Sequence, residues 1–298
     1  MVRAALTGMK KEFQLRTRYY WTLLVRTFCA WDSDNGLRMG AALAYYALFS
    51  LVPILFVAVT VAGAVFGDAS AQAEMLRQVR YYVGPHGAEA VRGLMAPMAA
   101  APAGPWGAIV SVAVLFFSAS GLVSELQSAL NDIWRVEPPP RLWLALLRRR
   151  ILAIGFVLGS GFLLLLTLVL SAVISAVSNY MGAMLPFSEL SLRGAEFLLS
   201  FGVATFLVAM VYKYLPDVRI AWRDVWTGAG VTSVLLTLGN QVIGLFLVKS
   251  GIATGFGAAG SLILVVVWIY YASQLLYFGA EFTRVHAQER GLAAGRRS

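Results

Sequence analysis

Hydrophobic positions in this chain gather into six long stretches, separated by shorter segments that hold most of the charged residues. The stretches cover residues 40–66, 106–130, 151–177, 195–215, 225–248 and 259–280. A helix rises about 1.5 Å per residue and the hydrocarbon core of a bilayer is roughly 30 Å thick, so about 20 apolar residues make one crossing. The pattern predicts an all-α protein, a polytopic membrane helical bundle with six transmembrane helices.

Composition agrees with a membrane environment. Hydrophobic residues make up 59% of the 298 positions and charged residues only 13%, which leaves too little polar surface to coat a soluble globule of this size. The fourth stretch is the shortest and has Glu196 and Lys213 near its ends, so it is the weakest of the six predicted crossings.

Lysine and arginine lie mainly on one side of the predicted bundle. The N-terminal arm, the second and fourth connections and the C-terminal tail hold 19 of the 24 basic residues. Basic residues near span ends are retained in the cytoplasm, so both termini are predicted to be cytoplasmic. The predicted organisation is a basic amphipathic arm at 1–38, a six-helix membrane domain at 39–284 with a long external, periplasmic loop at 67–105, and a basic tail at 285–298.

The N-terminal arm shows an amphipathic pattern over residues 9–31. Its large apolar residues fall within about 100° of a helical circumference. They are Phe13, Tyr20, Trp21, Leu24, Phe28 and Trp31. The pattern is typical of a helix lying on the cytoplasmic membrane surface, which would make membrane lipids a partner, but a helix packed against the bundle would show it too.

The second stretch has a small and polar face. At 100° per residue one arc of about 100° holds Ser111, Ser118, Gly121, Glu125, Ser128 and Asp132. Close helix packing also uses small residues, so packing alone would explain most of this face. Glu125 is different, because it lies more than a turn inside the boundary marked by Asn131 and Asp132. We expect it to have a basic partner or to contact a water-filled cavity.

The sixth stretch repeats this arrangement. Tyr270, Gln274, Tyr277 and Glu281 lie within about 60° of one another on one helix face. Glu281 is near the cytoplasmic end and could equally be a boundary residue that pairs with Arg284 one turn on. If the polar faces of the second and sixth stretches meet, Glu125 and Glu281 would line a cavity open to the cytoplasm.

The first stretch adds Tyr45, Tyr46 and Ser50, followed by Pro53 near the middle of the membrane. Proline frees a backbone carbonyl one turn earlier and usually kinks a helix, although such a kink is often only architectural. The candidate transport path therefore lies between the first, second and sixth predicted spans.

The sequence lacks the residues that most classes of enzyme chemistry require. The single cysteine, Cys29, allows neither an intramolecular disulfide nor a metal-thiolate site, and no phosphate-binding G-x-x-x-x-G-K-[ST] motif is present. The spans hold no Ser/His pair, paired aspartates or H-E-x-x-H motif. We expect no cofactor, no metal site and no enzyme activity, with a lipid-modifying transferase that uses Glu125 as a base as the remaining enzymatic alternative.

Three segments carry a family resemblance. They are AALAYYALFSLVPIL at 41–55, LQSALNDIWRV at 126–136 and GFGAAGSLILVVVWIYYASQLLYFGAEFTRV at 255–285. These segments resemble the YihY/BrkB family of bacterial inner-membrane proteins, some of which are labelled ribonuclease BN. The resemblance implies six spans, a long first external loop, a location in the inner membrane and, for some members, ties to serum resistance and envelope lipid biology.

A ribonuclease would need clustered histidines and carboxylates, yet the two histidines, His86 and His286, are predicted to lie on opposite sides of the membrane. We therefore expect no nucleic acid partner. The function we expect is a carrier or flippase-like transporter of a lipid, a lipid-linked envelope precursor or another amphipathic substrate. A non-transporting scaffold is the alternative. The sequence leaves open a homodimer through a motif such as Gly155-x-x-x-Gly159.

Overall fold

The computed structural model of the chain describes residues 2–66, 120–136, 188–249 and 258–295. It also describes short stretches at 72–73, 75–77, 80, 88–89, 91–93 and 155. Within these residues the regular structure is helical and contains no strand, so the predicted all-α class is confirmed for this part of the chain. The predicted third span lies outside it apart from Gly155.

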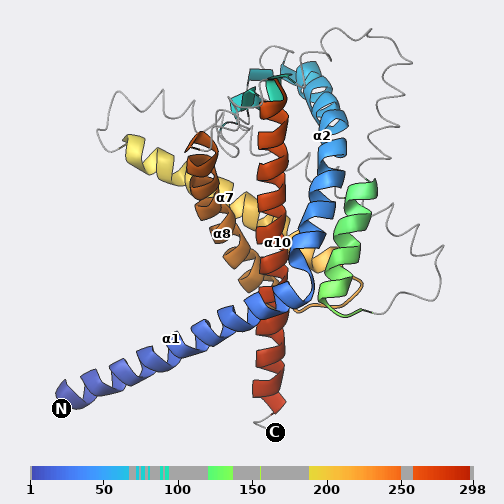
Figure 1. Cartoon of the computed structure of the whole chain (residues 1–298). Coiled ribbons are helices and arrows are strands. Elements are labelled where there is room, and N and C mark those ends of the chain that lie inside the picture. The colour runs from blue at the N-terminus through green and yellow to red at the C-terminus, as the bar shows by residue number, and fades with distance from the viewer. Residues whose placement is uncertain are drawn as a thin grey trace.

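Two helices meet at a corner near the N-terminus. α1 (Val2–Ser33) and α2 (Gly36–Phe66) are separated only by Asp34 and Asn35. Asn35 has a φ of 56°, in the left-handed region that asparagine enters more easily than most residues. As Figure 1 shows, α1 extends away from the bundle while α2 runs along it, so the corner sets the arm apart from the first predicted span.

Three more long helices pack in the described bundle, beside the helical segment 120–133. They are α7 (Ser188–Tyr214), α8 (Trp222–Lys249) and α10 (Ala258–Gly295), and they cover the fourth, fifth and sixth apolar stretches to within one residue. α10 stands at the centre, where it contacts α1, α2 and α8, while α7 packs on α8 (Figure 1). At about 1.5 Å per residue, the 38 residues of α10 are longer than a bilayer core is thick.

Two helical segments within the described residues are long and apolar enough to cross a membrane. They are Phe197–Tyr214 in α7 and Leu262–Gly291 in α10. The fourth stretch, which the sequence supported least, thus has the length and hydropathy of a crossing. Six crossings and cytoplasmic termini stay predictions.

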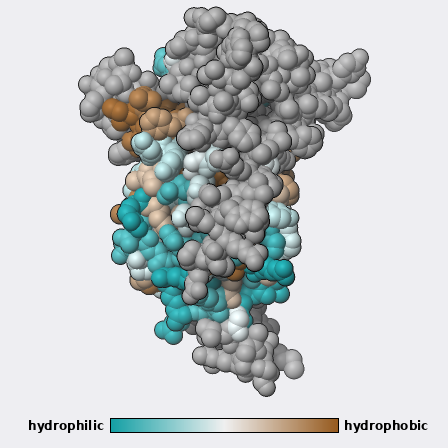
Figure 2. All heavy atoms as spheres, turned by 90° about the vertical axis from the view of Figure 1, so that its right-hand side faces the viewer, coloured by the Kyte–Doolittle hydropathy of each residue, from teal (hydrophilic) through white to brown (hydrophobic). Residues whose placement is uncertain are grey.

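One hydrophobic core joins α2, the helical segment 120–133, α7, α8 and α10. Tyr212, Tyr277, Leu130 and Ile133 are among its fully buried side chains. Large apolar residues also face outward on α7 and α8, among them Phe197, Leu198, Trp226, Leu238 and Val242. Hydrophilic residues gather in the lower half of the described surface, toward the end where α10 terminates (Figure 2). Apolar residues both inside and outside are what a helix with lipid on one side requires.

α8 and α10 approach closely through two reciprocal pairs of glycine and threonine. A Cβ atom on Gly228 would stand 1.7 Å from Oγ1 of Thr283, and one on Gly279 would stand 1.8 Å from Oγ1 of Thr232. Each threonine donates a hydrogen bond to the carbonyl of the glycine four residues earlier on its own helix, at 2.8 Å for Thr232 and 2.7 Å for Thr283. Small residues of this kind let two membrane helices pack backbone to backbone.

The arm is held to the end of α10 along one side. Leu23 of α1 is buried in a small cluster with Phe282 and Val285 of α10, and Arg26 of α1 pairs with Glu289. The opposite side of α1 leaves large residues exposed, among them Tyr20, Trp21, Leu24 and Phe28. These four residues of the predicted stripe are therefore not on the side that packs on α10, whereas Trp31, at the end of the stripe, is partly buried against the hydrophobic core.

Candidate functional site

An ionic cluster lies where the α1–α2 corner meets α10. Arg284 donates from Nε and Nη2 to Oε2 of Glu281, one turn earlier on the same helix, at 3.0 and 2.8 Å. The same guanidinium is 3.6 Å from Oδ2 of Asp34 at the corner, and Oδ1 of Asp34 accepts a hydrogen bond from Arg135 at 2.5 Å. The predicted pairing of Glu281 with Arg284 is confirmed, and Asp34 and Arg135 join it. These four residues are called the ionic cluster below.

Burial within the ionic cluster is uneven. Glu281 is fully buried and Arg284 is 8% exposed, whereas the Arg135 side chain is 65% exposed. Within the described residues, Oε1 of Glu281 and Oδ2 of Asp34 have no hydrogen-bond partner. Glu281 is therefore a buried acidic residue that pairs with Arg284, and not only a residue at the boundary of a membrane span.

Tyr277 lies one turn before Glu281, with its ring in the hydrophobic core and no exposed surface. Its hydroxyl has no hydrogen-bond partner within the described part of the chain. Glu125, on the helical segment 120–133, is half-buried and within electrostatic range of Tyr277, Arg38 and Asp132. The second and sixth polar faces thus approach each other at Glu125 and Tyr277, and Arg38 is a basic group close enough to interact with Glu125.

α2 approaches the same place from the other side. The Gln274 amide donates from Nε2 to the carbonyl of Leu37 at 3.3 Å, and a Cβ on Gly40 would stand 2.0 Å from that nitrogen. Tyr46 of α2 lies against Gly121, whose Cβ would be 3.1 Å from the Tyr46 ring. These contacts bring together polar residues from the first, second and sixth predicted spans, between which the candidate path was predicted to lie.

A second polar contact joins the segment 120–133 to the connection between α7 and α8. Asn131 donates from Nδ2 to Oδ2 of Asp217 at 2.9 Å and accepts from the Asp217 backbone N–H at 2.8 Å. Gln127 donates from Nε2 to the same Oδ2 at 3.1 Å. The sequence analysis missed Gln127, because it lies about 200° around the helix from Glu125 and belongs to another face.

We expect Asn131→Ala to lower the free energy of unfolding by about 2 kcal/mol, because it removes two hydrogen bonds to a carboxylate-bearing residue and leaves the buried side of Asp217 less satisfied. Unfolding by sodium dodecyl sulfate in mixed micelles, followed by tryptophan fluorescence, measures the change. Ser128→Ala, an exposed position on the same segment, is the control and should change stability little. Equal effects of the two substitutions would contradict the assigned role of Asn131.

The remaining predicted path residues are dispersed. Tyr45 is 60% exposed and packs on Phe49 with ring centres 4.8 Å apart, while Ser50 is buried and donates to the carbonyl of Ala47 at 3.0 Å. Tyr270 is partly exposed, and Ser128 and Asp132 are exposed. α2 continues through Pro53 as one helix and bends along its length (Figure 1). Ser118 lies outside the described residues.

Two of the described helices have the length and hydropathy of membrane spans, and the comparisons with known proteins agree that this is an integral membrane protein. The family described as virulence factor BrkB matches residues 27–298, and the chain belongs to that family. The resemblance to YihY/BrkB proteins found from the sequence is thereby confirmed.

Curated relatives carry the same description of a membrane protein. The chain is similar to a UPF0761 membrane protein of Verminephrobacter eiseniae, with 28% identity over 275 residues covering 90% of this chain and 63% of the relative. A UPF0761 membrane protein of Alcanivorax borkumensis is 24% identical over 268 residues, covering 89% and 59%. The chain spans about three fifths of the length of these relatives. No solved structure matches the chain.

Proposed function

We propose that this protein carries an amphipathic molecule, a lipid or a lipid-linked envelope precursor, between the leaflets of a bacterial inner membrane. In the proposal six helices cross the membrane, both termini are cytoplasmic, and no residue acts as a catalyst. The exposed aromatic stripe of α1 rests on the cytoplasmic lipid surface, where aromatic rings and Arg18 favour the boundary with anionic headgroups.

The observation that carries the proposal is a gradient of burial through polar groups from two helices. Asp132 is exposed, Glu125 is half-buried, and Tyr277 and Glu281 are fully buried. Polar groups in membrane proteins cost free energy unless they face protein or water, so a series that leads inward supports a path for a headgroup, a cation or a proton. In the proposal Glu125 meets the substrate first, because it combines access with a position close to the buried hydroxyl of Tyr277.

We expect Glu125→Gln to slow lipid exchange between leaflets roughly tenfold, which corresponds to about 1.4 kcal/mol in the rate-limiting state. The measurement uses proteoliposomes with headgroup-labelled phospholipids and compares wild type, variant and empty vesicles. Asp32→Asn is the matched control, because it removes the same charge from an exposed position on α1 outside the proposed path and should leave the rate nearly unchanged. Exchange that is unaffected by Glu125→Gln would remove Glu125 from the mechanism.

A scaffold without transport is the second candidate. Complete burial of Tyr277 within the core favours it, since that side chain packs against its neighbours as a structural tyrosine does. The same vesicles distinguish the two functions, because a scaffold gives exchange at the level of empty vesicles with both wild type and Glu125→Gln.

A further inference from the structure

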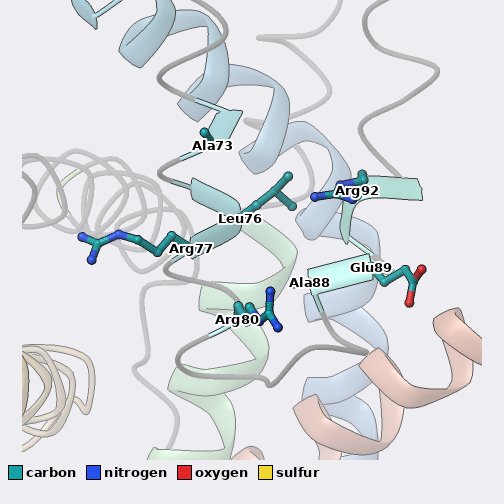
Figure 3. A pocket seen from close by; sticks show the side chains of 7 residues that line it. All are labelled: Ala73, Leu76, Arg77, Arg80, Ala88, Glu89 and Arg92. Carbon is teal, nitrogen blue, oxygen red and sulfur yellow. The ribbon is translucent and has the colours of Figure 1, made fainter.

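A pocket of about 500 Å³ lies at the end of the bundle opposite the α1–α2 corner, between the described helical stretches around Leu76 and around Glu89 (Figures 1 and 3). It is lined by Ala73, Leu76, Arg77, Arg80, Ala88, Glu89 and Arg92. All of these residues belong to the long loop that the charge pattern predicts to be external. The pocket is therefore far from the ionic cluster and distinct from the candidate path near Glu125.

The charges around this pocket are unbalanced. Its described lining holds three arginines, of which Arg77 already has an interaction partner, and one glutamate. In Figure 3 the guanidinium group of Arg92 points toward Leu76 and the carboxylate of Glu89 points away from both Arg92 and Arg80, while Arg80 lines the same pocket. Among the described lining residues the acidic group thus does not lie between Arg80 and Arg92, and the two guanidinium groups favour an anion in the pocket.

The chemistry of the lining selects a class of ligand. A guanidinium group is planar and presents paired N–H donors that match the oxygens of a phosphate group. Two such groups around one space fit an anion with more than one charge better than they fit a single carboxylate. Leu76, Ala73 and Ala88 add an apolar wall, and about 500 Å³ lies within the usual range for a small-ligand site.

We infer that this pocket binds the phosphate group of an anionic ligand, supplied either by a phospholipid headgroup or by a small soluble phosphate. As a binding site it stands on its own lining residues. Its role as the external receiving or loading end of a lipid path rests on the proposed function, and would make the carried molecule a phosphate-bearing lipid.

The test measures binding to the full-length protein, purified in an uncharged detergent. The probes are dioctanoyl phosphatidic acid, inorganic phosphate alone, and dioctanoylglycerol, which has the same acyl chains without phosphate. The pocket variant is Arg80→Gln with Arg92→Gln. The matched control is Arg219→Gln with Arg223→Gln, which removes the same charge from exposed positions outside the pocket. Titration calorimetry gives affinities, and thermal unfolding checks that each variant is folded.

We expect phosphatidic acid to bind the wild type and the control with similar affinity, and the pocket variant at least about tenfold more weakly, as the loss of charge-assisted hydrogen bonds implies. Competition by inorganic phosphate would identify the phosphate group alone as the ligand. Binding of phosphatidic acid without such competition would identify the lipid as its source. Binding that is equal in the pocket variant, or equal for dioctanoylglycerol, would overturn the inference.

The single substitutions Arg80→Gln and Arg92→Gln keep the test decisive if the double variant does not fold, since each alone should weaken phosphatidic acid binding. The outcome is separable from that of the vesicle assay. Binding that depends on the pocket arginines, together with no leaflet exchange above empty vesicles, would keep the phosphate site and reject transport. Leaflet exchange above empty vesicles without any binding at the pocket would keep transport and reject the phosphate site.

Discussion

Replacing Arg284 by methionine should destabilise the protein by about 3–5 kcal/mol, because it leaves two carboxyl groups at the ionic cluster without their shared cation. Glu281 has no exposed surface, and Arg284 is its ion-pair partner at 2.8 Å. Methionine is similar in length and apolar, so the loss arises from the unpaired charges more than from lost packing. Denaturation by sodium dodecyl sulfate in mixed micelles, followed by tryptophan fluorescence, measures the change in free energy.

Two further variants separate the charge effect from simple truncation. Arg135→Met removes the other partner of Asp34, but the Arg135 side chain is 65% exposed, so the expected loss is about 1 kcal/mol or less. Adding Glu281→Gln to Arg284→Met should recover part of the lost stability, since it removes one buried charge. If Arg284→Met and Arg135→Met cost the same, the ionic cluster would not have the strength assigned to it.

Gly279→Ala should destabilise the protein by about 1–3 kcal/mol, even though alanine is the better helix former. The added Cβ would stand 1.8 Å from Oγ1 of Thr232 and 2.7 Å from the hydroxyl of Tyr212. Neither group can easily move, because Thr232 is bonded to the carbonyl of Gly228 and Tyr212 donates to the carbonyl of Leu276 at 2.6 Å. α8 and α10 would therefore have to separate, and the same detergent titration measures the cost.

Gly291→Ala is the matched control on the same helix, where an added Cβ would have no atom within 4 Å. At Gly291 the higher helix propensity of alanine is not opposed by a steric clash, so this substitution should be neutral or stabilising by up to about 1 kcal/mol. Opposite signs at the two glycines would show that the close approach of the helices sets the effect. A stabilising effect at Gly279 would contradict the packing described for α8 and α10.

The helices could be predicted because their signal is contained in each segment alone. Apolar stretches long enough to cross a membrane became α2, α7, α8 and α10, and the pairing of Glu281 with Arg284 followed from their spacing of three residues. Extended helix ends were less predictable. α10 runs to Gly295, fifteen residues past the last apolar stretch, because its polar end gains contacts with α1 and α8 that no hydropathy pattern contains.

The parts that could not be predicted depend on contacts between distant segments. Asp34 reaches Arg284 only because the α1–α2 corner docks on α10, and no local pattern indicates that contact. Gln127 lies on another helix face than Glu125, and only the fold shows that Gln127 and Asn131 both bind Asp217. The reciprocal glycine and threonine pairs of α8 and α10 likewise become visible only when the two helices are placed side by side.

The spacing of Glu281 and Arg284 also bears on how the chain enters the membrane during synthesis. Because the two residues are one turn apart on α10, their charges neutralise each other as soon as that helix forms, before it meets any other helix. Insertion therefore does not expose a lone buried charge to lipid. Asp34 is synthesised before α10, so the pair of Glu281 and Arg284, once formed, meets a carboxylate that the chain already carries, 3.6 Å from Nη2 of Arg284 in the folded protein.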